Sequence, residues 1–143
     1  MCEITSSDGR GCIYFIVSKR LGTPLNFVLA DVISDFPSRM HGEGKYYIGV
    51  TSDPVWRFWG PDDWKHHHKW KTMFVLAAST GSGAQFLERA LLADPSIGRG
   101  CFWCTNIGPG GEGVPNEPDP EVPYFLYVVF GNPSVGSHKR VSR

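Results

Sequence analysis

The chain has 143 residues, of which 41% are hydrophobic and 13% aromatic, enough for the core of one compact domain and too few for two. Its 14 basic and 14 acidic residues cancel, which excludes a global positive field and leaves contact with nucleic acid to local patches. The sequence contains neither an apolar run long enough to span a bilayer nor a basic-then-apolar export signal at its start, so we expect a soluble, intracellular protein that makes no membrane contact.

The first part of the chain predicts two strands separated by an insertion. Residues 1–10 form a polar segment, and the β-branched and aromatic run 12–17 predicts a first strand. Residues 21–44 carry glycines and prolines around a short apolar patch that fits either a strand or a helix, so we treat them as an insertion. A second strand is predicted at 45–51.

A helix is predicted to begin directly after the second strand. Asp53 can accept a hydrogen bond from an amide of the first turn, and Pro54 suits the first helical position because it has no amide to leave unsatisfied. Arg57 then falls in the first turns of this helix. The polar segment 60–69 leads into an increasingly apolar run at 70–78, which predicts a third, buried strand.

The last third of the chain predicts one helix, a long irregular segment and a final strand. Ser82 and Gln85 have the spacing of a capping box, which indicates a helix that continues to about Leu92 and carries Glu88 in its middle. Glycines and prolines interrupt regular structure from there to residue 123, and the run 124–130 predicts a closing strand. Residues 11–130 therefore form the domain, and 131–143 a flexible basic tail.

Two tyrosines in similar frames precede an arginine on a helix. Cys12-Ile13-Tyr14, Tyr47-Ile48-Gly49 and Arg57 together resemble the GIY-YIG nuclease family. In that family a glutamate on a later helix holds a divalent metal, and Glu88 has this context. An asparagine often follows that helix, and Asn106 resembles it. The resemblance spans residues 12 to about 113.

The resemblance implies an α+β fold with a small, mainly antiparallel three-stranded central sheet flanked by helices, here with an additional C-terminal strand. The sequence departs from the family pattern at three points. The insertion 21–44 lengthens the connection between the Tyr14 and Tyr47 strands, so we expect it to bulge from a hairpin in which these two strands are paired neighbours. Cys12 replaces a glycine, and Pro61 stands where relatives often have a histidine. One of His66, His67 and His68 can fill that role, and we take His67 as its representative.

The resemblance also implies a function, metal-dependent endonuclease activity, with DNA as the expected substrate. Tyr47 would take the proton from the attacking water, Arg57 would bind the phosphate in a fork, and Tyr14 would orient the water or the phosphate. Glu88 would hold Mg²⁺ or Mn²⁺, with water and substrate oxygens completing the shell. Because a phenol has a pKa near 10, the metal and nearby cations must favour its ionised form.

Two alternatives remain open. The fold can serve as a catalytically inactive module that binds nucleic acid or protein, in line with the balanced net charge and the aromatic side chains of Trp56, Trp59, Trp64 and Trp70. Cys101 and Cys104 have the spacing of a zinc knuckle, which Cys2, Cys12 or the histidine run would have to complete. Without such partners, we expect the four cysteines to be reduced thiols.

Overall fold

The structure is a computed structural model that describes residues 2–5, 11–17, 22–40, 42–60, 70–111 and 113–131. Within these residues the chain forms five strands and three helices. In chain order they are β1 (Cys2–Thr5), β2 (Cys12–Phe15), α1 (Leu25–Met40), β3 (Tyr46–Thr51), α2 (Pro54–Trp59), β4 (Thr72–Ser79), α3 (Gly81–Ala93) and β5 (Tyr124–Phe130). None of the helices in the described part of the chain has the length and apolar character needed to cross a membrane.

The five strands form one mixed sheet in the order β1-β2-β4-β5-β3. β2 pairs with β1 antiparallel and with β4 parallel, whereas β5 pairs antiparallel with both β4 and β3. The predicted α+β class is therefore confirmed. The sheet itself differs from the prediction, because β1 adds a fifth strand and β2 pairs with β4 in parallel.

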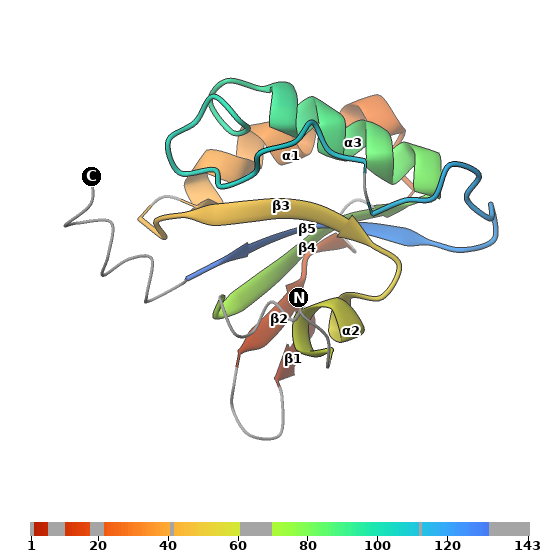
Figure 1. The fold of residues 1–143 in the computed structure, drawn as a ribbon, viewed down its shortest axis with the longest axis horizontal. Helices are drawn as coiled ribbons and strands as arrows, with labels where there is room; N and C mark the ends of the chain where they lie inside the picture. The colour runs from red at the N-terminus through yellow and green to blue at the C-terminus, as the bar shows by residue number, and fades with distance from the viewer. Residues whose placement is uncertain are drawn as a thin grey trace.

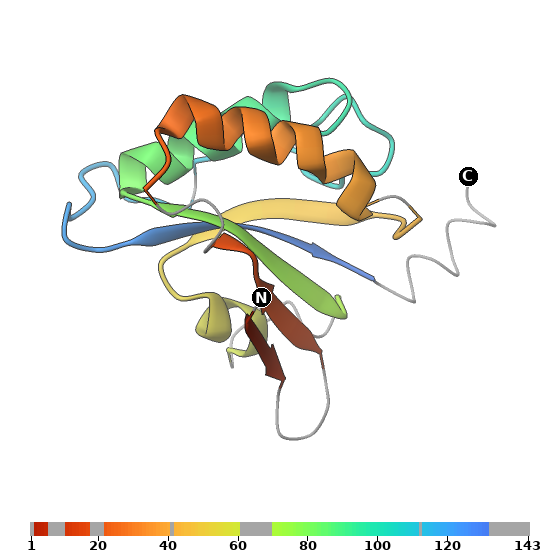
Figure 2. The ribbon, with the colours of Figure 1, turned by 180° about the vertical axis from the view of Figure 1, so that it is seen from behind.

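Helices cover both faces of this sheet (Figure 1). α1 and α3 lie together over one face, as the view from behind also shows (Figure 2), and α2 lies on the other. Each face has its own core. The core under α1 and α3 includes buried side chains of α1, β3, α3 and β5: Val32, Ile48, Leu87 and Val128. The core on the α2 side includes Ile13, Phe58, Val75 and Tyr127.

The predicted insertion is largely a helix that belongs to the core. Val28, Val32, Phe36 and Met40 recur every four residues and are all buried, which places them on one face of α1. This helix carries the chain across the sheet, so β2 and β3 do not form a hairpin. Residues 21–44 are therefore not a bulge in a paired hairpin, contrary to our prediction.

The helix that follows β3 begins as predicted. Asp53 is the N-cap of α2, and its Oδ1 accepts a hydrogen bond from Trp56 N at 3.0 Å. The start of α3 differs from the prediction. Its N-cap is Thr80, whose Oγ1 accepts from Gly83 N at 3.2 Å, and Ser82 already lies inside the helix. The four predicted strands are present, and β1 is a fifth that the polar segment 1–10 did not reveal.

Candidate active site

Tyr127 of β5 lies beside the glycine of the Tyr-Ile-Gly run. Gly49 on β3 is the direct cross-strand partner of Tyr127. A Cβ atom at position 49 would overlap the Tyr127 ring, coming within 2.5 Å of its Cζ and closer still to its hydroxyl oxygen. Glycine therefore makes room for the tyrosine, whose side chain is 2% exposed.

Three polar side chains act on the Tyr127 hydroxyl from three other elements. Burial raises the pKa of Tyr127 well above its ordinary value, and Tyr47 raises that pKa further. The Arg57 guanidinium lowers the same pKa, and Glu88 raises it with the smallest effect of the three. Side chains of β3, α2 and α3 thus all influence the ionisation of one buried hydroxyl on β5.

Tyr47 and Arg57 are the more accessible members of this group. Tyr47 pairs with Val129 of β5 and shares the α2-side face of the sheet with Tyr127 two positions along. Arg57 is half-buried, because Phe58 anchors α2 in the core next to it. The Arg57 Nε atom is buried and makes no hydrogen bond among the described residues, while the guanidinium interacts with Tyr127 electrostatically.

Glu88 is held under the glycine-rich loop that follows α3. It is 3% exposed, and its Oε1 accepts a hydrogen bond from Gly111 N at 2.7 Å. Gly110 packs so closely that a Cβ atom there would lie 3.0 Å from the Glu88 carboxyl carbon. Both glycines have positive φ, which side-chain-bearing residues rarely adopt. The loop thus closes over the carboxylate, and Gln85 Nε2 donates to Gly111 O at 3.3 Å.

Tyr14 does not join this group, so the prediction that its strand neighbours the Tyr47 strand is wrong. β4 and β5 separate β2 from β3. The register also places Tyr14 opposite Phe74, on the face covered by α1 and α3, whereas Tyr47 is on the α2 side. The Tyr14 ring meets Phe74 edge-on at 5.6 Å, and its position is explained by packing.

Asn106 holds the outer edge of β3. Its Oδ1 accepts from Ile48 N at 2.9 Å, and its Nδ2 donates to Ile48 O at 2.8 Å. Its backbone neighbours extend the same contact, since Tyr46 N donates to Trp103 O and Thr105 N donates to Tyr46 O, both at 2.9 Å. Asn106 therefore acts as a strand partner for the sheet edge, next to Tyr47.

Two further predicted features concern the histidine run and the cysteines. His66, His67 and His68 lie outside the described residues, as does Trp64. Trp56 is 47% exposed and Trp70 is buried. The described part of the chain contains no group of three or more His, Cys, Asp and Glu side chains that could hold a metal ion.

The sequence around Tyr127 resembles the sequence around Tyr14, but Tyr127 comes much later in the chain. Tyr127 stands in Leu126-Tyr127-Val128, an apolar frame like Ile13-Tyr14, within a run predicted to be a strand. Only the sheet order shows that β5, and not β2, lies against β3. No protein-family model matches the chain, and no curated protein or solved structure does either. The indication of function that remains is the set of side chains around Tyr127, namely Tyr47, Arg57 and Glu88.

Proposed function

We propose that this protein is a metal-dependent endonuclease that hydrolyses phosphodiester bonds, with DNA as the expected substrate. The observation that carries the proposal is the electrostatic coupling of Tyr127 to Tyr47, Arg57 and Glu88. Tyr47 and Tyr127 share one face of the sheet, and Tyr127 is buried with a raised pKa. A buried titratable group with a perturbed pKa and charged residues around it is typical of active sites.

The sheet order supports a GIY-YIG-like arrangement with one change. The family resemblance calls for a tyrosine strand beside the Tyr-Ile-Gly strand, and β5 occupies that place. β3, β5 and β4 are antiparallel neighbours within the larger mixed sheet, which supports a GIY-YIG-like arrangement. The strand expected first in the chain therefore comes last here, and Tyr127 replaces Tyr14 in the proposed site.

The two tyrosines differ in what they can do. Tyr127 is buried and its pKa is raised, so at neutral pH its hydroxyl is protonated and can donate a hydrogen bond. Tyr47 is half-buried, which allows its hydroxyl to meet water at the site. We therefore assign Tyr47 to proton transfer from the attacking water and Tyr127 to its orientation.

Arg57 and Glu88 supply the charges. Arg57 would bind the phosphate, because a guanidinium forms paired hydrogen bonds to phosphate oxygens. Among the described residues Glu88 is the carboxylate of the cluster, and its Oε1 is oriented by Gly111 N. Glu88 is a hard oxygen donor of the kind that Mg²⁺ and Mn²⁺ take, and it would supply one carboxylate oxygen, with water and phosphate as the other ligands. A bound cation would stabilise negative charge on the phosphate oxygens.

Plasmid cleavage with matched variants tests the proposal. Supercoiled DNA is incubated with Mg²⁺ or Mn²⁺ and wild type, Glu88→Gln, Tyr127→Phe or Tyr14→Phe. Glu88→Gln keeps an oxygen for the Gly111 amide and removes the charge. We expect Glu88→Gln to lose cleavage and Tyr127→Phe to slow it about 100-fold, the scale of a single positioned hydrogen-bonding group. Tyr14→Phe should cut at the wild-type rate.

Thermal unfolding of each variant separates lost chemistry from lost folding. The proposal fails if folded Glu88→Gln cuts as fast as wild type. Equal losses in Tyr14→Phe and Tyr127→Phe would instead show that the assignment of Tyr127 is wrong.

The burial of Glu88 and Tyr127 favours one second candidate. At 3% and 2% exposure these groups are poorly placed to touch a substrate. A module that binds nucleic acid or protein on the same fold needs no such contact. Binding of labelled DNA that is unchanged by EDTA and by Glu88→Gln, together with no cleavage, would support this candidate.

A further inference from the structure

Cys101 and Cys104 stand at the two ends of a tight turn. Cys104 N donates to Cys101 O at 3.1 Å, which is the closing hydrogen bond of a β-turn. Such a turn brings its first and fourth Cα atoms within about 7 Å, a separation that a disulfide can span. The two residues between them, Phe102 and Trp103, are exposed, so the turn stands at the surface.

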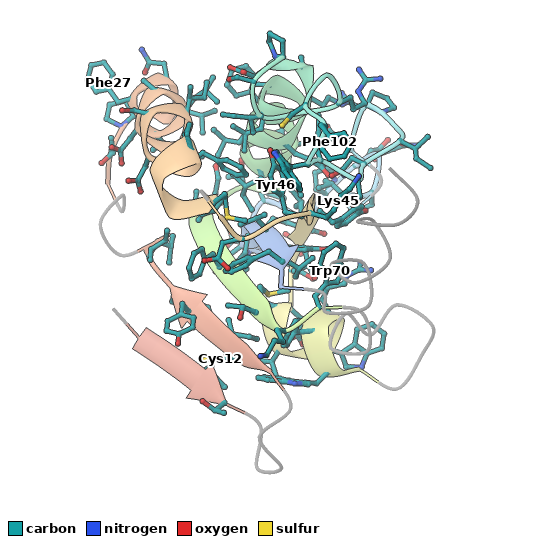
Figure 3. All side chains as sticks on the ribbon, turned by 90° about the vertical axis from the view of Figure 1, so that its left-hand side faces the viewer. Cys12, Phe27, Lys45, Tyr46, Trp70 and Phe102 are labelled. Carbon is teal, nitrogen blue, oxygen red and sulfur yellow. The ribbon has the colours of Figure 1, made fainter. Side chains whose placement is uncertain are left out.

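Contacts on both sides hold this turn in place. Lys45 Nζ donates to Phe102 O at 3.2 Å and lies 4.3 Å from the centre of the Phe102 ring, and the two side chains lie close together at the start of β3 (Figure 3). Trp103 O accepts from Tyr46 N at 2.9 Å. The turn therefore has a fixed conformation in which the cysteines are already near each other.

The two thiols have different surroundings. Cys101 lines a cavity of about 460 Å³ between the end of α1, the start of β3 and the loop after α3, together with Phe36, Met40, Tyr46 and Trp103. Its Sγ lies 3.4 Å from Tyr46 Oη, whose proton is donated to Ile97 O at 2.7 Å. Cys104 Sγ donates to Asn106 Oδ1 at 3.4 Å. Burial raises the pKa of Cys104, which disfavours its thiolate, and Cys104 does not line the cavity.

We propose that Cys101 and Cys104 form a reversible disulfide, with Cys101 as the thiol that meets the oxidant and Cys104 as the thiol that resolves the intermediate. The pair is reduced in the structure. The described residues offer it no third metal ligand. The inference is independent of the proposed endonuclease activity.

The oxidant is a low-molecular-weight disulfide such as oxidised glutathione. The Cys101 thiolate attacks one of its sulfur atoms, forms a mixed disulfide and releases one thiolate. The Cys104 thiolate then attacks the Cys101 sulfur and releases the second thiolate. The protein loses two protons and two electrons, and one oxidised glutathione becomes two reduced glutathione molecules.

Oxidation also changes a contact at the sheet edge. Once Cys104 is in a disulfide it has no proton to donate, so the contact from Cys104 Sγ to Asn106 Oδ1 is lost. Asn106 is the residue that pairs with Ile48 beside Tyr47. Oxidation of the turn would therefore change the contacts of the residue that pairs with the edge of β3.

Peptide mapping after equilibration in glutathione buffers tests the proposal. Trypsin cleaves after Arg99 and next after Lys139, so one peptide contains both cysteines and no others. In oxidising buffer this peptide should lose the mass of two hydrogen atoms and resist alkylation. The fold should favour the disulfide about tenfold over a synthetic peptide of residues 100–107. The proposal is overturned if the folded protein stays reduced at a glutathione ratio that oxidises the peptide.

Single substitutions test the two roles. Cys104→Ser should accumulate a mixed disulfide with glutathione at Cys101, because the resolving thiol is missing. Cys101→Ser should react much more slowly, since Cys104 does not line the cavity through which the oxidant would reach Cys101. Cys12→Ser, in β2, serves as the matched control and should behave like wild type. Equal reaction of Cys101→Ser and Cys104→Ser would refute the assigned order of attack.

Discussion

At position 49 the strand has no side chain, and the Tyr127 ring fills the space that one would occupy. The two residues are direct partners across β3 and β5. Because the ring is fixed in this way, the Tyr127 hydroxyl has a defined position among Tyr47, Arg57 and Glu88. Gly49 thus has a packing role inside its strand.

Gly49→Ala should therefore destabilise the protein. The added methyl group would overlap the Tyr127 ring, and relieving that overlap should cost about 1–3 kcal/mol of unfolding free energy. Urea denaturation measures the change. Gly100→Ala is the control, because its Cβ would have no neighbour closer than 3.4 Å and should shift stability by less than about 0.5 kcal/mol. Equal denaturation midpoints for the two variants would contradict the packing role.

Some residues of the candidate site can be predicted from local sequence, and others cannot. Arg57 and Tyr47 can be proposed together from the sequence, because the strand, the Asp53 cap and the helix are continuous in sequence. Tyr14 is the tyrosine that the resemblance selects, since it precedes Tyr47 in the chain and stands in an Ile-Tyr frame. Which of two tyrosine strands pairs with β3 depends on contacts between segments distant in sequence, and no local pattern encodes them.

At the scale of elements, the edge of β3 is completed by a side chain. Ile48 N and O face away from β5 at the sheet edge, and Asn106 satisfies both with its amide. This pairing ties the segment after α3 to β3. It also leaves the Ile48 backbone N–H and C=O paired, although β3 is an edge strand of the sheet.

Asn106→Asp should weaken this pairing while preserving the size of the side chain. A carboxylate oxygen would replace the Nδ2 donor and face Ile48 O, leaving both acceptors without a proton between them. We expect a loss of about 1–3 kcal/mol in unfolding free energy. Asn116→Asp, on an exposed loop, should change it little. Lost cleavage at full stability would instead indicate that Asn106 acts directly on substrate.

Element boundaries show where local signals suffice. The Asp53-Pro54 start of α2 is read directly from the sequence, since the cap and the proline act within one turn. The Ser82–Gln85 spacing predicts a helix start at Ser82, but the helix starts two residues earlier. Thr80 is its N-cap, because the Thr80 hydroxyl accepts a hydrogen bond from Gly83 N. The sequence does not distinguish strand from helix at α1. Gly22, Pro24 and Pro37 argue against a helix there, although the buried residues recur every four positions as in a helix.

For the whole molecule, two layers of helices around a mixed sheet bury two tyrosine hydroxyls. Tyr46 is 4% exposed on the face under α1 and α3, where its Oη donates to Ile97 O at 2.7 Å. Burial raises its pKa, with Cys101, Cys104 and Asp94 adding to the effect. Tyr127 lies on the α2 side and also has a raised pKa, first through burial. Each core therefore contains a tyrosine whose ionisation would destabilise the folded protein at high pH.

Stability should fall in alkaline solution because of these two residues. Below pH about 10 both are protonated in the folded and the unfolded protein, so their contribution is fully present. Above it the unfolded chain ionises while the folded state keeps both protons, and each tyrosine should remove roughly 1 kcal/mol of stability per pH unit. Urea denaturation at a series of pH values measures this slope.

Single substitutions assign that slope to its residues. Tyr46→Phe and Tyr127→Phe each remove one ionisable group, so each should make the alkaline loss of stability less steep than in wild type, and the double variant less steep again. Ultraviolet titration provides an independent measurement, because at least two of the five tyrosines should ionise only as the protein unfolds. If all five ionise together near pH 10 in the folded protein, neither hydroxyl is buried as the structure has it.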